Sequence, residues 1–83
     1  MTEQQRSILS QIKASLTEEV PGLKIDLRNV VDPEDGSESI VLCATNLPVA
    51  REAVRGAFSK VLSGFYYEIR SQGLNVGTMI EVA

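Results

Sequence analysis

The chain has 83 residues and a net charge of −3, and its hydrophobic content of 43% is typical of a globular protein. This length predicts a single domain, residues 1–83, with one small core. The acidic balance argues against broad electrostatic binding to nucleic acid, which requires a basic surface that neutralises phosphates.

The sequence contains no histidine, the side chain that most often serves as general base near neutral pH and as metal ligand. Cys43 is the single cysteine, so no internal disulfide can form. The first residues lack the continuous apolar segment of a secretory signal, and no apolar run approaches the roughly 20 residues that span a bilayer. We therefore expect a cytoplasmic protein that is not an enzyme and holds neither cofactor nor metal.

The N-terminal segment predicts a helix. Thr2 and Gln5 have the spacing of a capping box, and Pro21-Gly22 ends the pattern. Apolar residues recur between these limits at helical spacing, namely Ile8, Leu9, Ile12 and Leu16.

Two strands are predicted next. In residues 23–29, Leu23, Ile25 and Leu27 alternate with charged residues, which indicates a half-buried strand. Residues 32–38 contain Pro33 and Asp35-Gly36 and predict a turn. The apolar run of residues 39–44 predicts a strand buried on both faces or nearly so, and either Val41 and Cys43 or Ile40 and Leu42 face outward.

A second helix follows, opened by Asn46 and Pro48 and ended by Gly64. Its apolar stripe is the clearest periodic signal in the chain and consists of Val49, Ala50, Ala53, Val54, Ala57, Phe58, Val61 and Leu62.

Residues 65–70, FYYEIR, predict a third strand because apolar and polar residues alternate. Phe65, Tyr67 and Ile69 share the core face, and Tyr66 points outward. A turn at Ser71–Gly73 leads to a last strand over residues 74–83, with Met79 and Glu81 on its outer face.

The predicted order is therefore α-β-β-α-β-β, an α+β two-layer sandwich. A four-stranded antiparallel sheet in the order 3-4-2-1, as in a permuted ferredoxin-like fold, would carry both helices on one face. A shift of 42 residues aligns GLKIDLRN with GFYYEIRS, which is compatible with two αββ half-repeats at about residues 3–45 and 46–83. The alternative is that any two helix–strand units align this well by pattern.

The open face of this sheet is the candidate site. Its apolar middle and charged rim have the composition of a protein interface. The hypothesis is a non-enzymatic interaction module, such as an adaptor, regulatory subunit or inhibitor, that binds a protein partner or forms a homodimer. The interface residues it names are Lys24, Arg28, Tyr66, Glu68, Arg70 and Met79.

Three further residue patterns argue against other chemistry. Asp26 and Glu68 would lie on opposite edges of the predicted sheet, about 14 Å apart, too far for a glycosidase pair. The acidic turn at residues 32–38 departs from the calcium-loop pattern, and Cys43 lies in an apolar strand that favours a buried, unreactive thiol.

Two alternative functions stay open. A basic patch of Arg51, Arg55 and Lys60, with Arg70, would suit association with nucleic acid. RNA-binding domains use a GxxG loop or several outward aromatic residues, however, and this chain has no such loop and only one such residue. A small-molecule sensor, with its ligand at a dimer interface, is the other alternative.

Overall fold

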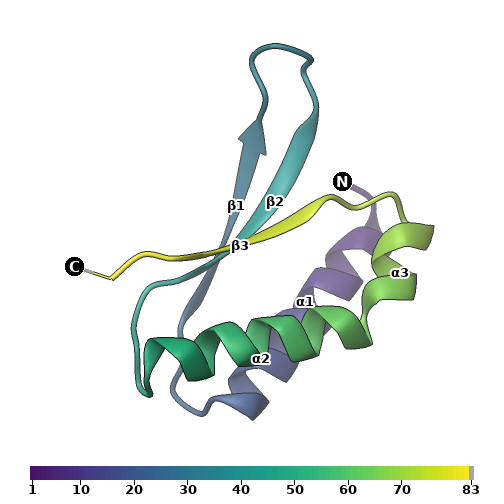
Figure 1. Cartoon of the computed structure of the whole chain (residues 1–83). Coiled ribbons are helices and arrows are strands. Elements are labelled where there is room, and N and C mark those ends of the chain that lie inside the picture. Colours follow the sequence, from purple (N-terminus) through teal and green to yellow (C-terminus); the bar gives the residue numbers. More distant parts are fainter. Residues whose placement is uncertain (83) are drawn as a thin grey trace.

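Three helices and three strands make up the structure, a computed structural model that describes residues 1–82 (Figure 1). The elements are α1 Glu3–Glu19, β1 Ile25–Val31, β2 Glu38–Ala44, α2 Arg51–Gly64, α3 Tyr66–Ser71 and β3 Val76–Ile80. The strands form one mixed sheet in the order β1-β2-β3. The helices lie on one side of this sheet, as predicted.

Helix α1 begins as its sequence predicts. The Thr2 hydroxyl accepts a hydrogen bond from the Gln5 amide at 3.1 Å, and the Gln5 side chain accepts one from the Thr2 amide at 2.9 Å. These two bonds satisfy amide groups that a helix start leaves free. The buried face of the helix consists of Leu9, Ile12 and Leu16.

Strands β1 and β2 form the predicted hairpin. They pair antiparallel, with Leu27 opposite Leu42 and Asp26 opposite Cys43. Gly36 has a positive φ of 73° in the connecting turn, a conformation that glycine adopts without strain. The carboxylates of the turn accept backbone bonds, since Asp32 accepts from the Glu34 amide and Asp35 from the Ser37 amide.

Helix α2 begins at Arg51 with Ala50 as its cap, four residues later than a cap at Asn46 predicts. Asn46 has another role: its side chain accepts a hydrogen bond from the Lys24 amide at 2.8 Å and donates one to the Gly22 carbonyl at 2.9 Å. It therefore fixes the connection between α1 and β1. The predicted apolar stripe is buried only in part. Val54, Ala57, Phe58 and Val61 are buried and Leu62 is half-buried, while Val49, Ala50 and Ala53 at its start are exposed.

The predicted strand over residues 65–70 is wrong, because this segment forms helix α3. Gly64 does not have the positive φ of a helix-ending glycine. The Phe65 amide donates to the Val61 carbonyl, and one residue later the chain is helical again. Helix α3 ends near Gly73, which has a φ of 64° and donates to the Arg70 carbonyl. The glycine that ends the helical region is therefore Gly73 rather than Gly64.

The new helix changes the environment of the aromatic cluster. Phe65 and Ile69, four residues apart on α3, pack against the core. Tyr66 is exposed, as expected, but Tyr67 is 81% exposed and does not belong to the core. The core contacts of FYYEIR therefore follow helical spacing, in which residues i and i+4 share a face, and not the alternation of a strand.

The sheet topology also differs from the prediction. The four-stranded antiparallel sheet with order 3-4-2-1 is not formed: β3 pairs parallel to β2, with Cys43 beside Met79 and Leu42 beside Thr78. A parallel pair requires a crossover of a dozen or more residues, and α2 and α3 provide it here. Residues 46–82 thus form two helices and a strand, unlike the αββ order of the first half. Ala83, the end of the predicted last strand, lies outside the described residues.

The core lies between the helices and the inner face of the sheet. Ile12 and Leu16 of α1, Val54 and Phe58 of α2, and Leu42 of β2 are at most 4% exposed. Ile25 and Ala44 join the same cluster from the sheet. No helix within residues 1–82 is long and apolar enough to cross a bilayer.

Candidate functional site

The side of the sheet away from the helices holds the candidate site. Because side chains alternate along a strand, burial of Ile25, Leu42 and Ala44 in the core turns their neighbours to the opposite side. The helix-free face, as we call it, consists of Asp26, Arg28, Val30, Val41, Cys43, Met79 and Glu81.

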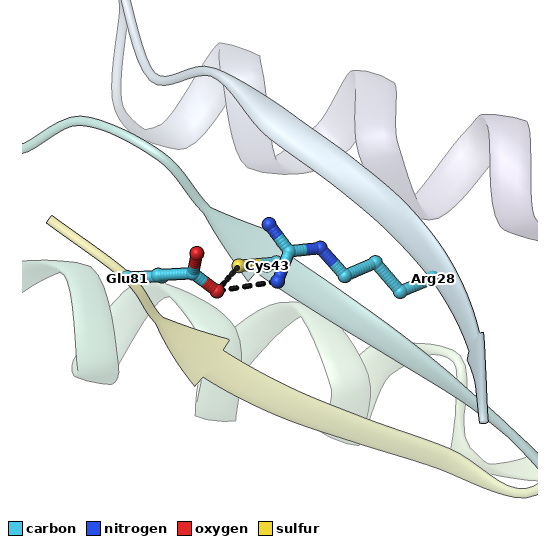
Figure 2. Close-up of polar contacts among 3 residues, drawn as sticks. All are labelled: Arg28, Cys43 and Glu81. Atoms are coloured by element: carbon cyan, nitrogen blue, oxygen red, sulfur yellow. Dashed lines mark hydrogen bonds and ion pairs between the residues drawn. The ribbon is translucent and has the colours of Figure 1, made fainter.

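The middle of this face is spanned by an ion pair. Arg28 of β1 and Glu81, just after β3, extend toward each other over the central strand (Figure 2). The Arg28 Nη1 donates to the Glu81 Oε2, and the same oxygen accepts a longer contact of 3.8 Å from the Cys43 Sγ. Arg28 of β1 and Cys43 of β2 thus both contact one carboxylate oxygen of Glu81, the residue that follows β3.

This arrangement fixes the charge of each group. The hydrogen bond from Arg28 lowers the pKa of Glu81 below its usual value, and the bond to Glu81 raises the pKa of Arg28. Both shifts favour the charged forms. Burial raises the pKa of the Cys43 thiol, with the nearby Arg28 opposing that shift. The ion pair is therefore charged at neutral pH, and the thiol is protonated.

Cys43 is completely buried although it lies on the helix-free face. A thiol that is buried and has a raised pKa is a poor nucleophile, because the thiolate is the reactive form. Within residues 1–82, no group of three or more His, Cys, Asp and Glu side chains is placed to hold a metal ion. Two carboxylates of the acidic turn, those of Asp32 and Asp35, accept backbone hydrogen bonds within the turn, and hydrogen bonds from Ser37 lower the pKa of Asp35.

Apolar side chains remain accessible around the ion pair. Met79 of β3 is 46% exposed and Val30 of β1 is 48% exposed, while Val41 between them in the sheet is half-buried. The side chains of Arg28 and Glu81 are themselves 42% and 56% exposed. The face thus combines accessible apolar groups with charges that a partner can reach.

The structure divides the predicted interface residues between two regions. Arg28 and Met79 lie on the helix-free face, and Lys24, immediately before β1, continues its alternation. Tyr66, Glu68 and Arg70 lie on α3, in the helical layer, which corrects their predicted place on an edge strand. There Arg70 donates to the Tyr66 hydroxyl at 2.9 Å, and its guanidinium carbon lies over the Tyr66 ring, 5.7 Å from the ring centroid.

Sequence reasoning placed Glu81 on the outer side of its strand but did not include it among the interface residues. Alternation was enough to orient it beside Met79. What the pattern did not contain was the parallel pairing of β2 and β3, which brings Glu81 within reach of Arg28 on β1. It also left the outward side of β2 open, and the structure assigns Val41 and Cys43 to it.

The predicted basic patch is likewise divided. Arg51 and Arg55 of α2 line one hollow of about 220 Å³ together with Thr78. Lys60 lies elsewhere on α2 and is paired with Glu19 of α1. The structure therefore brings two of the predicted basic residues together beside the β3 edge and places Lys60 in another environment.

No protein-family model, curated protein or solved structure matches this chain.

Proposed function

We propose that this chain is a non-enzymatic protein-interaction module that binds a protein partner, or a second copy of itself, through the helix-free face. The observation that carries the proposal is one-sided packing. The helices cover the inner side of the sheet, while Met79 and Val30 remain about half exposed on the other side. The predicted apolar middle is crossed by the Arg28–Glu81 ion pair, and the accessible apolar side chains lie beside it. Accessible apolar groups next to charged groups are compatible with a protein interface.

The charges on this face favour a partner whose surface carries both positive and negative groups. Arg28 on this face is accompanied by Asp26 and Glu81, and Lys24 lies next to it just before β1, so groups of both signs lie within a small area. Arginine and methionine are enriched in interfaces relative to the rest of the surface. Binding would rest on apolar contact at Met79 and Val41, with Arg28 and Glu81 setting orientation.

The test compares two single charge insertions at exposed positions. Met79→Glu places a carboxylate on the helix-free face, and Tyr67→Glu places one on the exposed side of α3. Proteins retained by the immobilised wild-type chain are first identified and purified, and their affinity for both variants is then measured. We expect Met79→Glu to lose binding and Tyr67→Glu to retain it, with circular dichroism confirming that both fold. The reverse order rejects the helix-free face as the binding surface.

One observation favours a second candidate, association with nucleic acid. Arg51 and Arg55 line the same hollow, so two cations face one site. If this function holds, affinity for a single-stranded oligonucleotide falls steeply as salt rises, and the double variant Arg51→Gln/Arg55→Gln loses it. Salt-insensitive partner binding that survives this double substitution supports the interaction module instead.

A further inference from the structure

Within residues 1–82, β1 pairs with β2 on one side and has no neighbouring strand on the other, so it forms one edge of the sheet. The Thr45 amide donates to the Lys24 carbonyl at 3.0 Å, and the Asp32 amide donates to the Ser37 carbonyl at 2.8 Å. Because hydrogen-bonded pairs recur at every second residue of an antiparallel ladder, the even-numbered residues between them direct their backbone groups to β2. The odd-numbered residues, such as Leu27 and Asn29, direct theirs to the free edge.

A groove runs beside this edge on the helix side. It has a volume of about 320 Å³, and Leu9 of α1, Leu27 and Asn29 of β1, and Ile40 of β2 contribute to its lining. Leu27 lies on the inner side of the sheet, opposite the fully buried Leu42, yet it is 43% exposed. The core therefore includes β1 at Ile25 but not at Leu27. An added strand would cover an apolar residue that the chain leaves open.

The charges on β1 match those of a second β1 strand placed at the free edge. In an antiparallel pair of two β1 strands centred on Leu27, Asp26 of each copy lies opposite Arg28 of the other. Residues so placed at a non-hydrogen-bonded pair have Cα atoms about 4.5 Å apart, and opposite charges there are stabilising. Leu27 of the two copies would meet at the axis on the groove side, in a hydrogen-bonded pair, as the outward direction of its backbone requires.

The neighbouring registers are less favourable. Centring on Arg28 or on Asp26 places like charges directly opposite each other, which is destabilising. Centring on Asn29 pairs Arg28 with Val30 and forms no cross-strand ion pair. Among these registers, the one centred on Leu27 alone joins charge complementarity with contact between the exposed leucines.

We propose that two copies of this chain associate through their β1 edges, antiparallel and centred on Leu27, to form a continuous six-stranded sheet. Arg28 has enough donors to bind both Glu81 of its own chain and Asp26 of the second copy. Dimerisation would also double the area of the helix-free face. This contact lies at the β1 edge of the sheet, so whether the dimer forms does not depend on whether Met79→Glu loses partner binding.

Charge exchange tests the register. Asp26→Arg places arginine opposite arginine in a homodimer, and Arg28→Asp places aspartate opposite aspartate, so each variant should sediment as a monomer. An equimolar mixture of the two restores both cross-strand pairs and should sediment as a dimer, like the wild type. Glu52→Arg, on the exposed side of α2, is the matched control and should remain dimeric. If Arg28→Asp fails to fold, Leu27→Glu replaces it as the disrupting variant, without the mixing step.

Cross-linking gives a second, independent measurement in a Cys43→Ala background. Leu27→Cys should form a disulfide between copies on mild oxidation, because hydrogen-bonded antiparallel partners have a Cα separation of about 5.5 Å, within disulfide range. Asn29→Cys should not, since it lies opposite Ile25 of the second copy. A monomeric wild-type protein overturns the proposal and leaves the edge to an extended segment of another protein. A dimer that survives both Asp26→Arg and Leu27→Glu overturns it as well.

Discussion

Arg28 and Glu81 meet across the central strand of the sheet, and their shared hydrogen bond lies directly above the buried thiol of Cys43 (Figure 2). Arg28 lies in the first strand, and Glu81 follows the last. Their contact therefore ties the two outer strands of the sheet to each other on the helix-free face.

The first prediction is that this tie is lost in acid. Because the pKa of Glu81 is lowered in the folded chain, its contribution to stability is complete above the unfolded value, about 4.3, and disappears as pH falls through the folded value. The raised pKa of Arg28 keeps the guanidinium charged throughout this range. Wild type should melt at a higher temperature than Glu81→Gln at pH 7, and the difference should vanish in acid.

A double-mutant cycle isolates the pair in that measurement. Arg28→Gln should lower the melting temperature about as much as Glu81→Gln, and the double variant should be little worse than either, since contacting residues are not additive. A difference in melting temperature between wild type and Glu81→Gln that persists in acid would contradict an ionic origin of the stabilisation.

The second prediction concerns the reactivity of Cys43. Burial of the side chain and the raised pKa of the thiol both lower the amount of accessible thiolate. We expect an aromatic disulfide reagent to modify Cys43 much more slowly in the native chain than in denaturant at the same pH. An exposed thiol introduced as Ser71→Cys in a Cys43→Ala background is the control and should react at once. Native Cys43 that reacts as fast as this control would show that the ion pair does not cover it.

The sequence was sufficient to predict an element where its apolar periodicity and its cap or turn residues indicate the same structure. In α1, apolar spacing and the Thr2–Gln5 cap indicate the same helix, and the structure has it. In the β1–β2 hairpin, alternation and the Asp35-Gly36 turn likewise agree. The stripe of α2 was recognised, while its start was misplaced because Asn46, a good capping residue, bonds the neighbouring loop instead.

FYYEIR shows where the sequence was not enough. Six residues contain too few repeats to separate a period of 2 from one of 3.6, and aromatic residues favour strands. Core contact through Phe65 and Ile69 satisfies the helical period, and Phe65 continues backbone bonding from α2. Because this segment is a helix, the sheet lacks the predicted fourth strand, and β3 pairs parallel to β2. Of the six predicted interface residues, Arg28 and Met79 lie on strands of the helix-free face and Lys24 directly precedes one, because their alternation is that of true strands. Tyr66, Glu68 and Arg70 lie on α3 instead.

A third prediction concerns the start of α1. The side chain of Gln5 accepts from the Thr2 amide and also donates to the Gln72 carbonyl at 2.8 Å, so it joins the N-terminus of α1 to the end of α3. Thr2→Ala should cost about 0.5–2 kcal/mol of unfolding free energy, as for other helix caps. Gln5→Ala should destabilise as well, whereas Gln4→Ala, at an exposed helical position, should change stability by less than about 0.5 kcal/mol. Equal urea midpoints for the Gln4 and Gln5 variants would rule out this link.

The last prediction compares two aromatic residues that lie close in the chain and differ in burial. Phe58 on α2 is 4% exposed and belongs to the core cluster, whereas Tyr67 on α3 is 81% exposed. Phe58→Ala should therefore cost about 3–5 kcal/mol, because it removes buried surface and leaves a cavity. That is a large share of the roughly 5–15 kcal/mol that stabilises a typical domain. Tyr67→Ala should stay within about 0.5 kcal/mol of wild type. Chemical denaturation of both variants measures the two values. A Tyr67→Ala loss as large as that of Phe58→Ala would mean that residues 65–70 face the core as a strand, and the three-stranded sheet described above would then be wrong.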